Sequence, residues 1–206
     1  MSSYKLSILI PTLYSRIEKF NTMVRKIMKQ VEDNGLTDRI EIISHFDNKS
    51  IGLSKKRTDM LRNANGDFVT FLDDDDDIGD DYIKLIYDSI VKNPDTHVIT
   101  FNQHCNCDGR VFFVQCDIGH DLTLNRTASP QVYMRYPWIW CVWKRELVCQ
   151  TPFSDPDPNK KNYGEDSHWI TNIKDKIKNE TKISALLHFY RYSSASTETQ
   201  NFNQNR

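Results

Sequence analysis

The residues best suited to chemistry are five consecutive aspartates, Asp73–Asp77, which directly follow the apolar run 68–72. Neighbouring carboxylates repel one another and raise each other's pKa values unless a cation lies between them. Hard divalent ions such as Mn²⁺ and Mg²⁺ take oxygen ligands and would relieve that repulsion. The alternative is a solvated acidic turn before a helix, which suits Asp77, Asp80 and Asp81 but not the earlier aspartates. We therefore expect the start of the run to hold a metal ion.

Other cation and phosphate sites are excluded by their spacing. In a calcium-binding loop that began at Asp73, glycine and glutamate would be required where Ile78 and Lys84 stand. The seven glycines never cluster, so the chain has neither a phosphate loop nor a dinucleotide fingerprint. Cys105 and Cys107 lack the paired spacing of zinc ligands. Any bound phosphate must therefore be met by a metal ion and basic side chains.

A second group of candidate residues lies far downstream. Glu165 and Asp166 follow Gly164 at the start of an expected helix, where acids are favoured even without catalysis. His188 lies in an apolar stretch, where a histidine is more often a core residue with satisfied hydrogen bonds than a ligand. An aromatic group is either core or a platform for stacking on a sugar or base. It consists of Tyr133, Tyr136, Trp138, Trp140 and Trp143.

The first half of the chain alternates between strands and helices, which positions these residues. Strands are expected at 5–10, 40–46 and 68–72; helices are expected from Arg16 to a C-cap at Asn34-Gly35, over 53–64, and around Ile83, Ile86 and Ile90 up to Asn93-Pro94. This order implies a mostly parallel sheet with helices on its faces. Ligands of such sheets bind outside the carboxyl ends of the strands, where the aspartates begin.

The second half does not continue this alternation of strands and helices. Strands are expected at 97–103 and 110–117, and a polar loop leads into the helix near Glu165. The tail 193–206 is rich in Ser, Thr, Asn and Gln and is expected to be flexible. We find no repeat and no linker, so the 206 residues are expected to form one domain.

Composition limits the partners and the compartment. With 27 basic and 28 acidic side chains the net charge is −1, so no global field recruits nucleic acid or anionic membranes. The apolar runs fall short of the roughly 20 residues of a membrane span, and the N-terminus lacks the layout of a signal peptide. Five cysteines without paired spacing fit reduced thiols. We expect a soluble protein of the cytoplasm, or of the host cytoplasm if it is viral.

Several segments together resemble the family 2 glycosyltransferases, which have a GT-A fold and use a nucleotide-sugar donor. They are, in the order that the family shows, "SILIPTLYSR", "IEIISHFDN", "SIGLSKKRTDMLRNANGDFVTFLDDDDD", "YGEDSHW" and "HFYRYSSAS". The resemblance implies a single α/β, Rossmann-like domain with a smaller mixed region on the acceptor side. Residues 1–103 would bind the nucleotide sugar, and residues 104–192 would carry the acceptor and catalytic functions.

The resemblance also implies a role for individual donor-side residues. Pro11, Thr12 and Asp47 would hold the uracil end of a UDP-sugar, and Arg57 would approach the base or the diphosphate. Asp73 and Asp75 would form the Asp-x-Asp pair. Of these, Asp75 is the expected ligand of Mn²⁺ or Mg²⁺, and Asp73, which is also a candidate ligand, or Asp74 would lie nearer the ribose.

Three further roles follow from the same resemblance. Asp166 would be the catalytic base with Glu165 as its supporting neighbour. His188 is a further candidate metal ligand, and Arg191 is a candidate phosphate contact. These parts predict a metal-dependent transfer of a sugar to an acceptor hydroxyl, which inverts the anomeric configuration if it occurs by a single displacement.

The sequence leaves the acceptor open. A glycan is the expected acceptor, and a hydroxymethylated base in DNA is the second choice. A local basic patch would serve the latter. Its candidate members are Lys55, Lys56, Arg57, Lys160 and Lys161. A module that binds a nucleotide sugar without turnover is the alternative of a different class.

Overall fold

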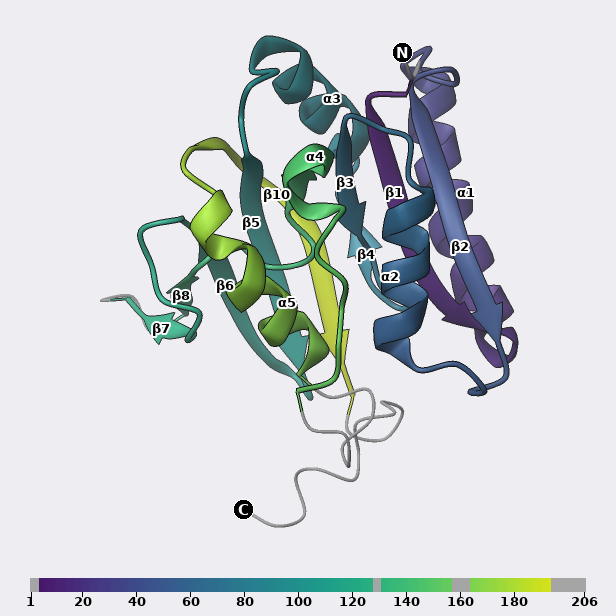
Figure 1. The fold of residues 1–206 in the computed structure, drawn as a ribbon. Coiled ribbons are helices and arrows are strands. Elements are labelled where there is room, and N and C mark those ends of the chain that lie inside the picture. The colour runs from purple at the N-terminus through teal and green to yellow at the C-terminus, as the bar shows by residue number, and fades with distance from the viewer. Residues whose placement is uncertain (1–3, 128–130, 157–163, 194–206) are drawn as a thin grey trace.

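The computed structural model describes residues 4–127, 131–156 and 164–193. The first half contains the expected alternation of strands and helices (Figure 1). Its elements are β1 (Leu6–Leu13), η1 (Tyr14–Arg16), α1 (Ile17–Asp33), β2 (Ile40–Asp47), α2 (Leu53–Asn63), β3 (Phe68–Phe71), β4 (Asp77–Ile78) and α3 (Tyr82–Lys92). The C-cap expected at Asn34-Gly35 is present, since Gly35 has a φ of 65°, a left-handed conformation that glycine adopts at little cost.

The second half adds more strands than the sequence predicted. Its elements are β5 (Val98–Cys107), β6 (Arg110–Cys116), β7 (Asn125–Arg126), β8 (Val132–Arg135), β9 (Val142–Lys144), α4 (Arg145–Val148), α5 (Glu165–Ile173), η2 (Lys174–Lys176) and β10 (Glu180–Tyr192). Both strands expected here are confirmed as β5 and β6, and the helix near Glu165 is confirmed as α5. Of the expected tail, residues 194–206 lie outside the described residues.

All these strands belong to one sheet with the order β2-β1-β3-β9-β5-β6-β8-β7, while β10 pairs with β5 and β4. Strands β2, β1 and β3 are parallel, which confirms the parallel arrangement expected for the first half, and β10 also runs parallel to β5. Short β9 joins the halves, antiparallel to both β3 and β5. Because β1, β2 and β3 point the same way, their carboxyl ends lie at one edge of the sheet.

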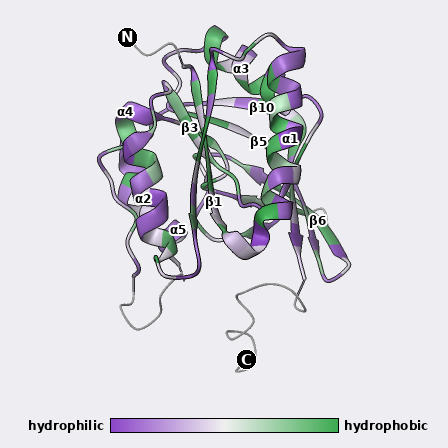
Figure 2. Cartoon of the chain, turned by 90° about the vertical axis from the view of Figure 1, so that its right-hand side faces the viewer, coloured by the Kyte–Doolittle hydropathy of each residue, from purple (hydrophilic) through white to green (hydrophobic). Residues whose placement is uncertain are grey.

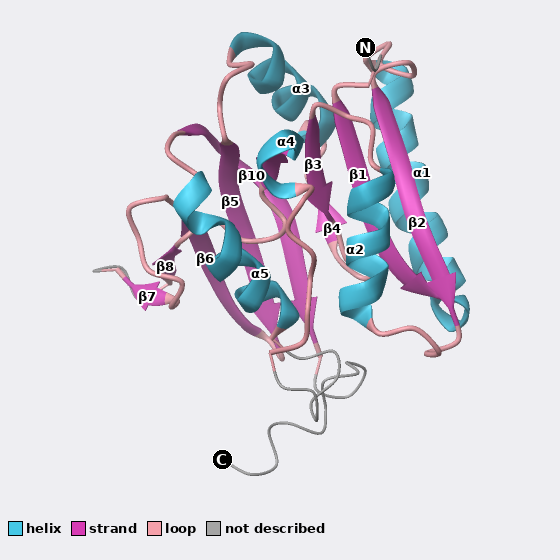
Figure 3. Cartoon of the chain, in the orientation of Figure 1, coloured by secondary structure: helices cyan, strands magenta, loops and turns pink. Residues whose placement is uncertain are grey.

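Helices cover both faces of the sheet, as expected. Helices α1 and α3 lie on one face, and α2, α4 and α5 lie on the other (Figures 2 and 3). Strand β1 is buried on both sides, and α1 contributes Met23, Ile27 and Val31 to the same core. Each such side chain contributes about 1.5–3 kcal/mol when it is fully buried. Among the described residues, no helix has the length and apolar character needed to span a membrane.

One glycine sets the spacing between β1 and the turn before β3. A Cβ atom at Gly66 would lie 2.6 Å from the backbone nitrogen of Ser7, so only glycine fits without a shift of the backbone. The Gly66 amide donates to the Ser7 hydroxyl at 2.8 Å. This close approach helps fix β3 beside β1, and therefore the position at which the aspartate run leaves the sheet.

Candidate active site

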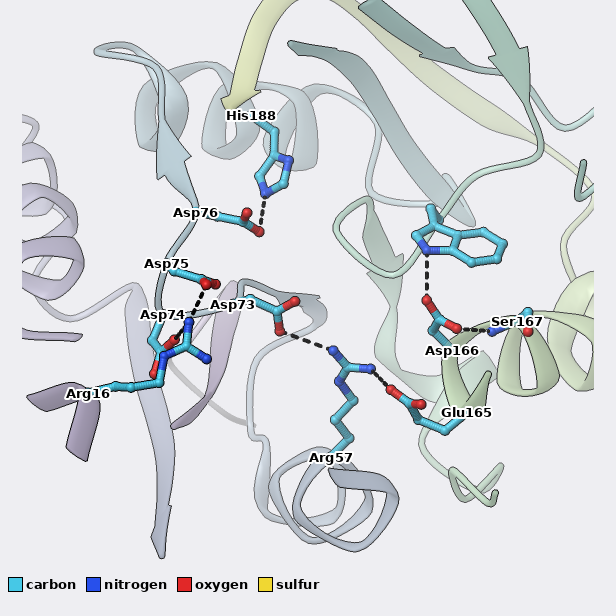
Figure 4. A network of polar contacts seen from close by, with 11 residues as sticks. Arg16, Arg57, Asp73, Asp74, Asp75, Asp76, Glu165, Asp166, Ser167 and His188 are labelled. Atoms are coloured by element: carbon cyan, nitrogen blue, oxygen red, sulfur yellow. Dashed lines mark hydrogen bonds and ion pairs between the residues drawn. The ribbon is translucent and has the colours of Figure 1, made fainter. Parts of the chain in front are cut away.

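The aspartate run leaves the carboxyl end of β3 and crosses the edge of the sheet to β4 (Figure 4). At the same edge, Leu13 and Asp47 are register partners at the ends of β1 and β2. Parallel strands thus bring together side chains that are far apart in the sequence. This is the edge at which open α/β sheets bind their ligands.

Every aspartate of the run has a basic partner in the protein. The pairs are Asp73 with Arg57 at 3.1 Å, Asp74 with Arg16 at 2.8 Å, Asp75 also with Arg16, Asp76 with His188 at 3.0 Å, and Asp77 with Lys26 at 2.8 Å and Arg191 at 3.2 Å. These pairs correct one premise of the sequence argument. Basic side chains therefore relieve much of the repulsion within the run, and this repulsion does not by itself require a metal ion.

Asp74 and Asp76 have the most buried side chains of the aspartate run, 1% and 6% exposed. Burial, together with the neighbouring carboxylates of Asp75 and Asp73, raises the pKa of Asp74 to about 6, although the Thr12 hydroxyl and Arg16 act in the opposite direction. Thr12 donates to the Asp74 carboxylate at 2.5 Å. Asp74 therefore links β1 to the turn, and the contacts proposed for it with the donor remain a prediction.

The residues present fit a hard divalent ion by their chemistry. Asp73, Asp74 and Asp75 offer only carboxylate oxygens, which Mn²⁺ and Mg²⁺ prefer. Within the described part of the chain, no three His, Cys, Asp or Glu side chains are grouped so that they could hold an ion as they stand. The reason is visible in Figure 4, where the carboxylates point at Arg57 and Arg16. The metal roles of Asp73 and Asp75 stay predictions.

His188 is a buried residue of β10, and both of its ring nitrogens have partners. Nδ1 lies 2.8 Å from the amide nitrogen of Gln103, and Nε2 lies 3.0 Å from Asp76. The Gln103 oxygen accepts from the Cys105 thiol, so the Gln103 amide donates to Nδ1 and the ring proton belongs on Nε2, facing Asp76. The ring also stacks on Trp140 with centroids 5.4 Å apart. In this arrangement His188 faces Asp76 and not Asp73 or Asp75, and its role as a metal ligand stays a prediction.

Asp47 forms a buried ion pair with Lys56, a residue to which the sequence assigned no separate role. The Lys56 ammonium contacts the Asp47 carboxylate and donates to the Thr12 carbonyl at 2.7 Å. Burial raises the pKa of Asp47, but Lys56 and the Ile51 amide outweigh burial and hold it below its usual value. The pair therefore connects the ends of β1 and β2 to α2.

The burial of Lys56 could have been predicted from the helical spacing of its neighbours. Leu53, Met60 and Leu61 form one apolar stripe of α2, and positions 56 and 57 fall on the same stripe. A lysine and an arginine inside an apolar stripe must be buried, and buried charges need partners. The sequence should therefore have predicted ion pairs for both.

Arg57 joins the aspartate run to α5. Arg57 is 2% exposed, and its guanidinium donates to Glu165 at 2.5 Å and to Asp73 at 3.1 Å. Burial raises the pKa of Glu165, while Arg57 opposes that shift. These pairs occupy Arg57 within the protein, and its proposed contact with the donor remains a prediction.

Asp166 lies beside Glu165 in the first turn of α5. The turn begins at Gly164, which has a φ of 74°. The Asp166 carboxylate accepts from the Ser167 amide at 2.7 Å and from the Trp138 indole N–H at 3.1 Å. The Arg135 guanidinium lies 3.3 Å from the centre of the Trp138 ring. Trp138 and Arg135 thus orient the predicted base, which the sequence did not indicate.

The remaining predicted residues fall into three groups. Tyr136, Trp140 and Trp143 are buried, so the core interpretation holds for most of the aromatic group. Pro11 is buried in β1 opposite His45. Arg191 is exposed and reaches the site through Asp77.

The expected basic patch for DNA is not formed by the described residues. Lys56 and Arg57 are buried in ion pairs, and Lys55 pairs with Asp59 at 2.7 Å. Lys160 and Lys161 lie outside the described residues. Burial of two of its members removes the support that this patch gave to a nucleic-acid acceptor.

A parallel sheet edge with an acidic turn and a separate acidic pair defines the class of the protein. The fold is a GT-A fold, and the model of glycosyl transferase family 2 matches residues 21–140, more than half of the chain. The chain therefore belongs to glycosyl transferase family 2, which confirms the resemblance found in the sequence. No curated protein sequence matches the chain.

Solved structures share this fold at low sequence identity. The TM-score with S. aureus TarS 1–349 in complex with UDP-GlcNAc is 0.61, at 14% identity over 96% of this chain and 61% of that chain. For the TarS 1–349 complex with UDP the TM-score is 0.62, at 16% identity over 92% of this chain and 61% of that chain. For the catalytic domain of Drosophila β1,4-galactosyltransferase 7 in complex with xylobiose the TM-score is 0.56, at 12% identity over 98% of this chain and 80% of that chain. The chain thus spans 61% of the length of the TarS structures with bound nucleotide.

Proposed function

We propose that this protein is a metal-dependent, inverting glycosyltransferase that moves a sugar from a UDP-sugar to a hydroxyl group of a glycan. The observation that carries the proposal is the bridge from Asp73 through Arg57 to Glu165, beside Asp166. This bridge supports one site with two separate groups of carboxylates. Sugar transfer needs both, one at the leaving diphosphate and one at the attacking hydroxyl.

Donor binding is proposed for the edge formed by β1, β2 and β3. Asp47 would accept the N–H of uracil at the tip of β2, and Thr12 would lie beneath it. The TarS structures with bound UDP-GlcNAc and UDP support a uridine donor for this fold. A Mn²⁺ or Mg²⁺ ion on Asp75 and Asp73 would act as a Lewis acid on the departing diphosphate. His188 and Arg191 remain candidates for the same region. Residues 1–103 would form the half of the protein that binds the donor. The proposed location of the protein is the cytoplasm.

Proton removal is proposed for Asp166, in the acceptor half 104–192. The acceptor oxygen attacks the anomeric carbon as the bond to the diphosphate breaks, and its proton passes to the Asp166 carboxylate. One displacement of this kind inverts the configuration at the anomeric carbon. Trp138 and Ser167 would hold the carboxylate in place, each through one hydrogen bond.

A glycan is favoured over a DNA base as the acceptor. Of the basic residues that suggested nucleic acid, the three that the structure describes are engaged in ion pairs, two of them buried. The galactosyltransferase with this fold was solved with xylobiose, which supports a sugar acceptor.

The test is a screen of UDP-sugars with Mn²⁺, measuring release of UDP with and without candidate glycans. We expect acceptor-dependent release that stops in excess chelator and in Asp75→Ala. The matched control is Asp80→Ala, because the Asp80 side chain is 100% exposed. Binding of UDP without release in any arm would leave a binding module as the function. Salt-dependent DNA binding by the protein would favour a modified base as the acceptor.

A further inference from the structure

Arg16 contacts Asp75, the proposed metal ligand of the Asp-x-Asp pair, and its neighbour Asp74. It is the last residue of η1, the short turn between β1 and α1. Its guanidinium lies 2.8 Å from the Asp74 carboxylate and also contacts Asp75. Within the described residues, these two carboxylates are the ion-pair partners of Arg16.

We propose that Arg16 competes with the divalent ion for Asp75, which it shares with the proposed metal site, and moves onto the donor's diphosphate when both ligands bind. Arg16 would then make binding of the metal ion and of the nucleotide depend on each other. The inference rests on the proposed function, since it concerns the order in which that site fills.

Electrostatics gives the reason for this dependence. An ion that binds alone must displace Arg16 and leave a guanidinium beside a doubly charged cation, which is unfavourable. A diphosphate that arrives with the ion supplies anionic oxygens for both, and Arg pairs well with phosphate. Coupling of this kind is reciprocal, so the nucleotide strengthens ion binding by the same factor as the ion strengthens nucleotide binding.

The other basic residues that pair with Asp73–Asp76 are less free to move. The Arg57 side chain is 3% exposed and is held by Glu165 as well as Asp73, while the Arg16 side chain is 26% exposed and lies on a three-residue turn. His188 is buried between Gln103 and Asp76. Among the basic partners of Asp73–Asp76, Arg16 is therefore the one that can change partners without opening the core.

The experiment measures Mn²⁺ binding by electron paramagnetic resonance, with and without UDP, in the wild type, Arg16→Gln and Arg16→Lys. Without UDP we expect Arg16→Gln to bind Mn²⁺ about tenfold more tightly than the wild type, a coupling in the usual range. UDP should tighten Mn²⁺ binding strongly in the wild type and much less in Arg16→Gln. Arg16→Lys keeps the charge and should resemble the wild type.

The control for general loss of positive charge is Lys26→Gln, because Lys26 pairs with Asp77 and not with Asp74 or Asp75. It should leave Mn²⁺ binding close to the wild-type value. Equal Mn²⁺ affinity of wild type and Arg16→Gln without UDP would overturn the inference, as would an equal gain in Lys26→Gln. In either case, UDP-dependent Mn²⁺ binding by the wild type would leave the proposed function standing. A wild-type protein that binds neither ligand in any arm would contradict both.

Discussion

Arg57 of α2 and Glu165 of α5 form a buried ion pair, with 2.5 Å between Nη1 and Oε1, across 108 positions of the sequence. Arg57 also reaches Asp73, so one guanidinium holds the aspartate run and the acidic pair at a fixed separation. The two motifs lie far apart in the sequence. This side chain therefore helps to fix their relative position, together with the packing of Phe71 in β3 against Trp169 in α5.

Replacement of Arg57 by methionine should destabilise the protein by about 3–5 kcal/mol, because Glu165 and Asp73 would each lose a buried partner. Glu165→Gln should lower the free energy of unfolding by less than Arg57→Met does. The variant that carries both substitutions should lower it by less than the sum of the two single losses. Urea denaturation measures all three free energies of unfolding. Arg62→Met is the control, since Arg62 is an exposed arginine of the same helix. Similar losses in Arg57→Met and Arg62→Met would contradict the bridge.

The Lys56–Asp47 pair predicts a pH dependence of stability. In the wild type the pKa of Asp47 lies below its ordinary value of 3.8, so the stability that the pair contributes is present at neutral pH. It is lost as the pH falls through the lowered pKa. In Lys56→Met, burial would raise the pKa of Asp47. The free-energy cost of a buried, unpaired carboxylate is therefore present in full at neutral pH and disappears when Asp47 is protonated.

Urea denaturation of Lys56→Met should therefore show a loss of about 3–5 kcal/mol at pH 7 and a clearly smaller loss at pH 4. Lys55→Met is the control, because the exposed pair of Lys55 with Asp59 is worth only about 0.3–0.5 kcal/mol. A loss that is the same at both pH values would mean that Asp47 carries no charge that Lys56 compensates.

Asp47→Ala should weaken the binding of every UDP-sugar to the same degree, because the proposed contact is with the base and not with the sugar. Removal of a hydrogen bond to a charged group predicts a loss of about 1.5–3 kcal/mol, or roughly ten- to hundredfold. Calorimetry with UDP and with several UDP-sugars measures it. A change of sugar preference at unaltered UDP affinity is the result that this assignment does not allow.

Trp138→Phe removes the indole N–H that Asp166 accepts and keeps a ring beneath Arg135. Loss of one hydrogen bond to a carboxylate should lower kcat about tenfold while UDP affinity stays unchanged. This division separates a positioning residue from one that only stabilises the fold. Tyr133→Phe is the control, because it removes the hydroxyl that accepts from Arg110 and leaves the Trp138–Asp166 hydrogen bond in place. Equal turnover in Trp138→Phe and the wild type would exclude the positioning role.

Local sequence patterns predicted the helices and strands better than they predicted the ion pairs between side chains. Periodic apolar residues located α1, α2 and α3, because one-sided burial leaves a repeating signal in the sequence. Strand β9 was missed, since three residues in an aromatic-rich segment show no period. Strand β4 was missed because its two residues include the last aspartate of the run.

The same limit applies to the site. Types and order of residues indicated Asp73, Asp75, Asp166 and the sheet edge. They did not indicate which cation meets which aspartate, because Arg16, Arg57 and His188 come from three different elements. Such pairings are set by how strands and helices pack, and a charge count along the chain cannot reveal them.

The central claim is that one site binds a nucleotide sugar and uses Asp166 to accept the proton of the attacking hydroxyl. The measurement is transfer by Asp166→Asn in a single turnover, beside calorimetry of UDP in the same preparation. The variant keeps the shape of the side chain and removes the proton acceptor, so UDP affinity should stay near that of the wild type. Transfer should fall by about 10²- to 10⁴-fold or more. Transfer at the wild-type rate would contradict the claim, and Glu165→Gln would then be the variant to measure.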